Sequence, residues 1–286
     1  MHPLLRFYLL FAWLILPAWG KGIEGATAVG SFTVVDEWIG RLSGEELKHY
    51  ALIPSGGELH GYTLSAQDAR KLSQAVLIVG INPQLEPWLA DWAKANQREA
   101  DLLWLHPEPL PSGSHLWIIP DEVAKMLSKL AKRMETMGVK NSQNNLNQQL
   151  KEVNAVKKDL QEAFALLPPA RRTFISQHQG LEGYAAAVGL KVAGSLLESA
   201  SAESADPSAR RYADLLKVIR EEKVRVITVD EGQNHAFAER LSKDAGLPPP
   251  VPLCFEYLAK PGTPGDTWAS MMRLNSRKLA EALARP

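Results

Sequence analysis

The stretch that decides the fold is residues 144–167, NNLNQQLKEVNAVKKDLQEAFALL, which Pro168 and Pro169 follow directly. Its apolar side chains recur every three or four residues, at Leu146, Leu150, Val153, Val156, Leu160, Phe164 and Leu167. This spacing predicts one amphipathic helix of about seven turns, about 36 Å long at 1.5 Å per residue, which the two prolines end. A helix of that length can lie along two lobes and tie them together.

Short apolar runs alternate with helical patterns on both sides of this helix. We expect strands at residues 31–35, 75–79, 102–105, 116–119, 173–176, 191–193, 224–229 and 251–255. Helical patterns cover residues 66–74, 86–96, 122–137 and 209–222. This alternation predicts an α/β fold of two lobes, each with a mostly parallel sheet flanked by helices. Because parallel sheets bind ligands beyond the carboxyl ends of their strands, we expect a ligand cleft between the lobes.

The expected lobes are residues 21–141 and 168–286, joined by the connecting helix over residues 142–167. A stretch rich in Ser, Ala and acidic residues, 198–208, carries no pattern and predicts an exposed loop.

Residues 1–20 have the order of a secretory signal peptide. Arg6 supplies a positive charge, residues 7–16 form an apolar run, and small residues follow ahead of Lys21. Ten apolar residues are too few to span a bilayer, which needs about twenty. Because no Cys follows the run, we expect a mature chain without a lipid anchor, free outside the cytoplasm.

Composition excludes several classes of function. The 286 residues carry 32 Lys and Arg against 32 Asp and Glu, and this balance predicts no nucleic-acid partner. A hydrophobic content of 45% suffices for a buried core and argues against disorder. The single cysteine, Cys254, lies in an apolar stretch and predicts a buried small side chain. One cysteine forms neither an internal disulfide nor a Cys-based zinc site, so any metal needs nitrogen and oxygen ligands.

Three histidines lie where a loop meets regular structure. His60 follows a Pro-Ser-Gly-Gly turn, His115 follows Pro-Ser-Gly-Ser, and His178 follows the apolar run from residue 173. Such junctions are where sites are built, although an ordinary loop histidine fits the pattern equally well. Solvated surface positions are expected for three others: His49, His106 and His235.

Carboxylates close two of the predicted strands. Asp230 and Glu231 follow residues 224–229, and Glu256 follows residues 251–255. Either group could point into a cleft, although a surface turn is the commoner place for such residues. The pattern alone leaves this choice open.

Several motifs along the chain resemble those of one known family. They are LIPSGGELHGY at residues 52–62, SAQD at 65–68, EPWL at 86–89, SHLW at 114–117, GL at 189–190, FEYL at 255–258, GDTW at 265–268 and MMRLN at 271–275. They are similar to motifs of the solute-binding proteins of zinc and manganese ABC transporters, periplasmic metal-binding proteins with a rigid helix between their lobes. The C-terminal motifs, like that family's carboxylate, Gly-Asp-x-Tyr and Met-Met-x-x-Asn, are the most specific match.

The resemblance implies four metal ligands, two from each lobe: His60 and His115 from the first, His178 and Glu256 from the second. It also implies an ABC-transporter membrane permease as the partner. Three imidazoles and one carboxylate suit Zn²⁺ at about 2.0–2.2 Å. Metal binding would then close the cleft.

Three positions depart from the family pattern. Gly113-Ser114 replaces Asp-Pro before the second histidine, Gly183 stands where Tyr is usual, and Glu256 stands where Asp is common. Family members dedicated to zinc often carry a His-rich acidic loop between the first two ligands, whereas only His106 lies in that interval here. Imidazole ligands nevertheless favour Zn²⁺ as the transported ion, with Mn²⁺ or Fe²⁺ as the alternatives.

Two other classes of function stay open at this point. A zinc-dependent hydrolase would use three histidines and an open fourth position, but no His-Glu-x-x-His motif occurs and Glu256 would fill that position. A binding protein for an organic solute or a metal chelate would need aromatic walls. The tryptophans that could supply them, unless they pack in the core, are Trp38, Trp88, Trp117 and Trp268. We therefore expect a monomeric metal receptor and no enzymatic activity.

Overall fold

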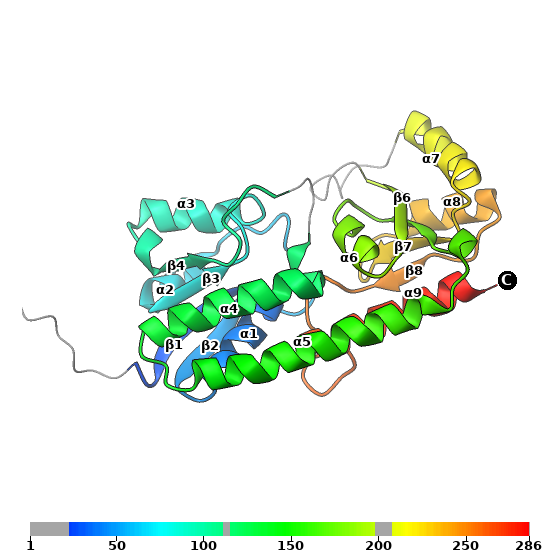
Figure 1. The fold of residues 1–286 in the computed structure, drawn as a ribbon. Helices are drawn as coiled ribbons and strands as arrows, with labels where there is room; N and C mark the ends of the chain where they lie inside the picture. The colour runs from blue at the N-terminus through cyan, green and yellow to red at the C-terminus, as the bar shows by residue number, and fades with distance from the viewer. Residues whose placement is uncertain (1–22, 111–114, 198–207, 286) are drawn as a thin grey trace, which may run out of the picture.

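The computed structural model describes residues 23–110, 115–197 and 208–285. Within these residues, two α/β halves lie along one long helix, α5 (Ser142–Ala165), as Figure 1 shows. The predicted signal peptide, the departure at Gly113-Ser114 and nearly all of the predicted loop over residues 198–208 lie outside the described residues. None of the helices described here combines the length and the apolar character needed to cross a membrane.

The first half contains a four-stranded sheet in the order β2-β1-β3-β4, in which every pairing is parallel. Its strands are β1 (Ala26–Phe32), β2 (Leu47–Ile53), β3 (Leu77–Gly80) and β4 (Leu102–Trp104). Its helices are α1 (Thr33–Ser43), α2 (Ala66–Gln74), α3 (Pro87–Ala95) and α4 (Pro120–Thr136), with short 3-10 helices η1 (Glu99–Asp101) and η2 (Leu116–Ile118). Successive strand residues face opposite sides, so this sheet buries apolar side chains on both faces.

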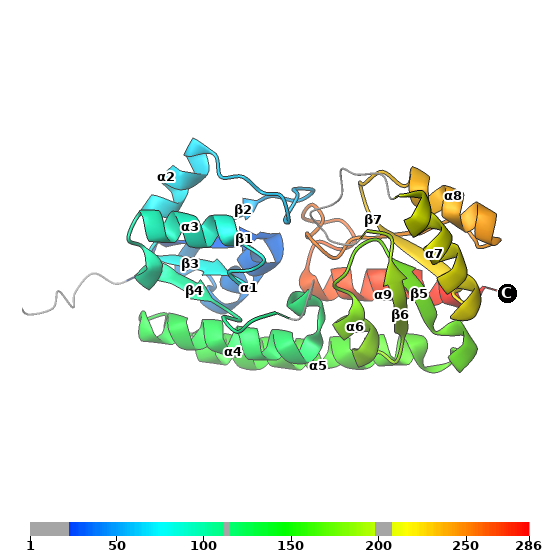
Figure 2. The same cartoon turned by 90° about the horizontal axis from the view of Figure 1, so that it is seen from above.

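The second half repeats this plan with the strand order β6-β5-β7-β8, again all parallel. Its strands are β5 (Thr173–Ser176), β6 (Lys191–Ser195), β7 (Val226–Asp230) and β8 (Val251–Leu253). Its helices are α6 (Glu182–Ala187), α7 (Ala209–Glu221), α8 (Ala236–Ala245) and α9 (Trp268–Ala284), with the 3-10 helix η3 (Pro169–Arg171) between α5 and β5. Seen from above in Figure 2, the two halves lie side by side along α5.

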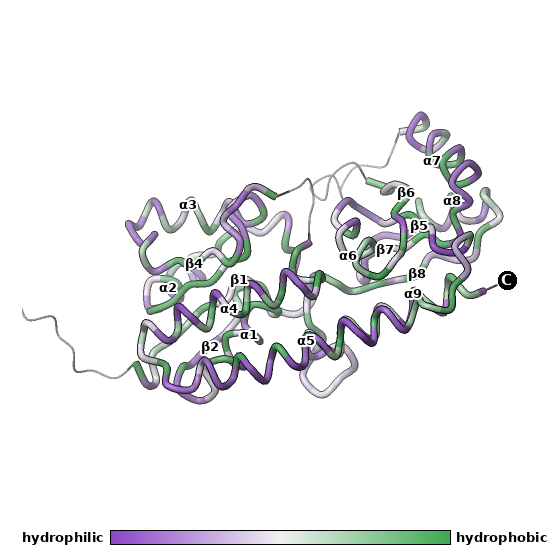
Figure 3. The backbone as a smooth tube through the Cα atoms, viewed as in Figure 1, coloured by the Kyte–Doolittle hydropathy of each residue, from purple (hydrophilic) through white to green (hydrophobic). Residues whose placement is uncertain are grey.

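One hydrophobic core runs from the first half into the second along α5. The buried side chains of α5 include Leu146, Val156 and Phe164, and apolar and polar residues alternate along the helix in Figure 3. Two buried indole groups connect the halves: Trp117 Nε1 donates to the carbonyl of Phe255 at 2.6 Å, and Trp268 Nε1 donates to the carbonyl of Trp117 at 2.7 Å. Buried hydrogen bonds of this kind hold the halves together on the α5 side.

The predicted α/β fold of two lobes on a long helix is confirmed. The helix over residues 66–74 and the strand over residues 173–176 match α2 and β5 residue for residue, and the long helix lies two residues earlier than predicted. The lobe limits at residues 141 and 168 stay a prediction.

One of the strand predictions is wrong, and a second is wrong in part. Residues 116–119 form η2 rather than a strand, because the N–H groups of Ile118 and Ile119 bond to the carbonyls three residues earlier and Pro120 begins α4 at once. Residues 33–35 belong to α1, since β1 ends at Phe32. The pattern also missed several elements: β2, α1, α6, α8 and α9.

Candidate metal centre

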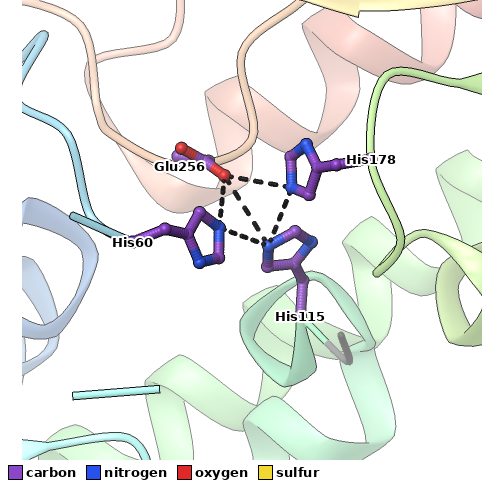
Figure 4. A group of neighbouring side chains, drawn as sticks. All are labelled: His60, His115, His178 and Glu256. Carbon is purple, nitrogen blue, oxygen red and sulfur yellow. Dashed lines mark hydrogen bonds and ion pairs between the residues drawn. The ribbon is translucent and has the colours of Figure 1, made fainter. Parts of the chain in front are cut away.

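Four side chains meet between the two halves: His60, His115, His178 and Glu256 (Figure 4). Each offers one ligand atom, and these four atoms lie within 4.8 Å of one another. They are the four residues that the sequence resemblance implied. Three imidazole nitrogens and one carboxylate oxygen are atoms that can bind a divalent metal ion.

The parallel topology explains why these residues meet. His60 follows β2, His178 lies two residues after β5, and Glu256 lies three residues after β8, so each comes from the carboxyl end of a strand. His115 occupies the position before η2. Because the carboxyl ends of parallel strands share one edge of each sheet, two facing sheets bring such loops to a common point.

The spacing of the ligand atoms fits a tetrahedral ion. The Nε2 atoms of His60 and His115 are 3.2 Å apart, and those of His115 and His178 are 3.3 Å apart. The Glu256 Oε1 atom lies 2.8 Å from His60 Nε2, 3.2 Å from His178 Nε2 and 3.7 Å from His115 Nε2. Four ligands held about 2.0–2.1 Å from a tetrahedral Zn²⁺ lie about 3.3 Å from one another. These five separations scatter around that value, and all four atoms lie within 4.8 Å of one another.

His115 is the most deeply buried ligand, with 1% of its surface exposed. Its ring packs against Trp117 at a centroid distance of 4.5 Å and an angle of 66°, which fixes the ring plane. Burial, helped by the nearby positive charge of His178, lowers the pKa of His115 well below its usual value. The ring is therefore neutral at physiological pH, which is the form that binds a metal.

His178 is held by a carboxylate that the sequence pattern did not select. Its Nδ1 donates to Asp230 Oδ2 at 2.7 Å, which orients the ring so that Nε2 faces the other three side chains. Burial opposes a charged ring, but the bonds to Asp230 and Glu256 outweigh it and raise the pKa of His178 to about 10. A metal that binds here must displace that proton. Asp230 does close β7, yet nothing in the sequence links it to His178.

Glu256 supplies the negative charge of the cluster. Burial would raise its pKa, but hydrogen bonds from His178 and His60, helped by electrostatic attraction to the neighbouring imidazoles, lower it strongly. The carboxylate therefore stays ionised while the imidazoles stand around it. Its charge offsets half of the charge of a divalent cation.

A cavity of about 340 Å³ lies at the mouth of the cluster and includes Glu256 in its lining. The other lining residues come from three loops: Gly56, Gly57, Glu58, Asp230, Glu231, Gly232, Gln233, Leu253, Cys254, Phe255 and Tyr257. These loops follow β2, β7 and β8, so both halves contribute to the mouth. Four of its residues carry carboxyl groups, which suits the passage of a cation.

The remaining histidines lie outside the cluster. His49 is exposed, as predicted, and pairs with Asp36 at 2.7 Å. The prediction of a solvated surface position does not hold for His106 and His235, which are both half-buried. His235 Nε2 donates to the carbonyl of Asp230 at 2.9 Å and so braces the loop that carries Asp230.

Two other predictions are refined by the structure. Cys254 is half-buried rather than buried, and its thiol donates to the carbonyl of Tyr257 at 3.3 Å. At Gly183 an added Cβ would clash with Ile119 Cδ1, so the Tyr of the family pattern would not fit without a shift.

Of the tryptophans proposed as cleft walls, Trp38, Trp117 and Trp268 are buried in the core and Trp88 is partly buried against it.

Comparison with known proteins points to one family. Residues 29–282 match the family described as zinc-uptake complex component A, periplasmic. The metal ABC transporter substrate-binding lipoprotein SsaB of Streptococcus sanguinis is 23% identical over an alignment of 277 residues that covers 90% of this chain and 89% of SsaB.

Solved structures share the fold at lower identity. The periplasmic zinc-binding protein TroA of Treponema pallidum superposes with a TM-score of 0.80 and 18% identity, over 91% of this chain and all of TroA. The Mn-bound periplasmic metal-binding protein of Candidatus Liberibacter asiaticus superposes with a TM-score of 0.79 and 17% identity, over 90% of this chain and 99% of that one.

Proposed function

Because the chain belongs to the zinc-uptake complex component A family, we propose that it captures Zn²⁺ between its two halves and delivers it to an ABC-transporter permease. Within that family the chain is a substrate-binding protein of metal ABC transporters, not an enzyme. The metal is its cargo, and the proposed ligands are His60, His115, His178 and Glu256.

The observation that carries this proposal is the spacing of the four ligand atoms. Five of their six separations, 2.8–3.7 Å, lie near the tetrahedral edge expected for an ion bound about 2.0–2.1 Å away, and all four atoms lie within 4.8 Å of one another. Four protein ligands fill a tetrahedral shell and leave no position for a reactive water, as a holding site requires. Two ligands come from each half, so binding draws the halves together.

The choice of Zn²⁺ rests on ligand type. Imidazole nitrogens bind Zn²⁺ more tightly than Mn²⁺ in the Irving–Williams order, whereas manganese sites favour more oxygen ligands. Mn²⁺ is the second candidate, because a structural neighbour with the same fold is described as Mn-bound and Glu256 could bind through both oxygens. Fe²⁺ is the third.

The location and organisation follow the same proposal. The family description names a periplasmic component, and residues 1–20 have the order of a signal peptide, so we place the mature chain in the periplasm. Residues 21–141 and 168–286 would be the two metal-binding lobes of a monomer. An organic solute is disfavoured because the tryptophans lie in or against the core and the mouth cavity is lined by carboxyl groups.

Metal content and competition titration test the proposal directly. Purified protein should retain about one Zn²⁺ per chain, the His178→Ala variant should lose it, and His106→Ala should retain it as a histidine control outside the cluster. Tighter retention of Mn²⁺ than Zn²⁺ would replace the proposed cargo. Metal retained by His178→Ala at wild-type affinity would contradict the four-ligand assignment.

A further inference from the structure

Glu58 makes two hydrogen bonds that join the metal cluster to the opposite half. Its Oε1 accepts from the backbone N–H of His60 at 3.1 Å, and its Oε2 accepts from Gln233 Nε2 at 3.1 Å. Glu58 lies in the loop after β2 of the first half, whereas Gln233 lies between β7 and α8 of the second half. One carboxylate therefore connects a ligand-bearing loop to the other side of the cleft.

This contact lies at the mouth of the cluster. Glu58 and Gln233 are both half-buried, and both line the 340 Å³ cavity that also includes Glu256. In Figure 2 the light-blue segment between β2 and α2 extends toward the second half. Because the pair remains in contact with solvent, each partner can exchange its bond for one to water when the halves separate.

The loop on the Gln233 side is itself tied to a metal ligand. Asp230 accepts from His178 Nδ1, and the Asp230 carbonyl accepts from His235 Nε2, which fixes the loop from residue 230 to residue 235. Glu58 is tied to His60 on its own side in the same way. The pair therefore links the surroundings of His60 to those of His178.

The opposite side of the cleft is closed by buried bonds. Trp117 and Trp268 donate their indole N–H groups to carbonyls in the core. The backbone N–H of Leu258 adds a partly buried bond to Thr33 Oγ1 at 2.8 Å. Breaking such bonds would leave buried polar groups unpaired, which costs more than breaking a bond in contact with water. Separation of the halves should therefore begin at the mouth.

We propose that Glu58 and Gln233 form a latch that slows the release of the bound metal. This inference rests on the proposed function and identifies Glu58 as a positioning residue, because it acts through His60 and through the opposite loop rather than on the ion. The latch must open before the ligands from the two halves can part. Its loss should increase the dissociation rate, with the metal stoichiometry retained.

Two substitutions remove the latch in different ways. Glu58→Gln keeps the size of the side chain but removes its charge, so its bond to the Gln233 amide loses the charge assistance of a carboxylate acceptor. Gln233→Ala removes the opposite partner and leaves the bond from Glu58 to His60 intact. Glu231→Gln is the matched control, since it removes a carboxylate from the same cavity whose own ion pair, to Lys278 at 3.4 Å, stays within the second half.

The experiment loads each full-length mature protein with Zn²⁺ and follows its release by stopped flow after addition of excess chelator. We expect release to be about fivefold faster in Glu58→Gln and in Gln233→Ala, as for the loss of one charge-assisted hydrogen bond in contact with solvent. The double variant should be no faster than the quicker single variant, and Glu231→Gln should match the wild type.

Each other outcome has a defined meaning. Unchanged release in both single variants, additive acceleration in the double variant, or equal acceleration in Glu231→Gln would overturn the latch while leaving the proposed function in place. A wild-type protein that binds neither Zn²⁺ nor Mn²⁺ would overturn the proposed function and the latch together.

Discussion

The two halves share one strand order, yet each surrounds its buried carboxyl group differently. In the first half, Glu86 is completely buried and its Oε2 accepts from the backbone N–H groups of Ile81 and Asn82, at 2.6 and 3.0 Å. Burial raises the pKa of Glu86 to about 7 in spite of these bonds. In the second half, Glu256 lies among imidazoles, which lower its pKa instead.

This difference shows what a buried carboxylate needs in order to stay charged. Backbone N–H groups carry only partial positive charges, so they offset only part of the cost of burying a charged carboxylate. An imidazolium group carries a full positive charge and offsets more of that cost. A cation bound in the cluster would have the same effect more strongly. The carboxyl of the second half is therefore suited to a metal, and that of the first half to tying the loop after β3 in place.

The halves also differ in the kind of side chain that each brings to the cluster. The first half supplies two imidazoles, His60 and His115, and the second supplies one imidazole with both anions, Glu256 and Asp230. The negative charge that these groups bring to balance a bound cation therefore comes from the second half. Four predictions test how the two halves differ and how α5 joins them, beginning with the largest expected effect.

Removing the anion from the ligand set should have the largest effect. Glu256→Gln keeps the shape of the side chain but eliminates its charge, and four ligands share a binding free energy on the order of 10–16 kcal/mol. We expect Zn²⁺ affinity to fall by about a hundredfold or more in a chelator competition titration. Asp159→Asn, which removes a carboxylate of α5 paired with Arg273, is the control and should bind as the wild type does. Equal affinities in the two variants would refute the assignment of Glu256.

Asp230→Asn should have the next largest effect. The amide no longer stabilises the Nδ1–H form of His178, and loss of such an outer partner costs about 10–100-fold in metal affinity. The same titration measures this loss, and His49→Ala serves as a control because its partner, Asp36, lies in the first half away from the cluster. Wild-type affinity in Asp230→Asn would mean that ring packing alone orients His178.

Glu86→Gln should alter the dependence of stability on pH. The folded-state pKa of about 7 lies above the reference value of 4.5, so the folded protein holds the proton between these limits and stability declines as pH rises through them. We expect the wild type to lose about 2 kcal/mol of unfolding free energy between pH 5 and pH 8 through this group, and Glu86→Gln to lack that contribution. Urea unfolding of metal-free protein at both pH values measures it, with the exposed Glu99→Gln as control. Parallel pH profiles of wild type and Glu86→Gln would rule out the raised pKa.

The ion pairs of α5 should have the smallest effect. Lys157 pairs with Asp121 of α4 at 2.7 Å, and Asp159 pairs with Arg273 of α9 at 2.6 Å, so one turn of α5 contacts both halves. Because all four side chains are more than a third exposed, Lys157→Met and Asp159→Asn should each cost less than about 1 kcal/mol of unfolding free energy. Urea unfolding at neutral pH measures both, and a larger loss would show that one half depends on α5 electrostatically.

The helix over residues 142–165 and the alternating strands were predictable because their signal is local. Periodic apolar residues and terminal prolines act within a few turns, so α2 and α5 could be placed from the sequence. Strand β1 and helix α1 were displaced or missed because residues 28–35 are almost all buried, and an element buried on every side shows no alternation. Residues 116–119 are apolar, as a strand would be, but they form a 3-10 turn because α4 begins at Pro120 directly after them.

The sequence by itself determined the two-lobed α/β fold, the residue types of the site and, through its resemblance to a family, the four proposed ligands. Only the tertiary structure decided that Asp230 holds His178 and that Glu58 reaches Gln233, because 52 and 175 positions along the chain separate these partners. No local periodicity carries information over such distances. Parallel topology supplies it instead, by bringing the carboxyl ends of separate strands to one point between the halves.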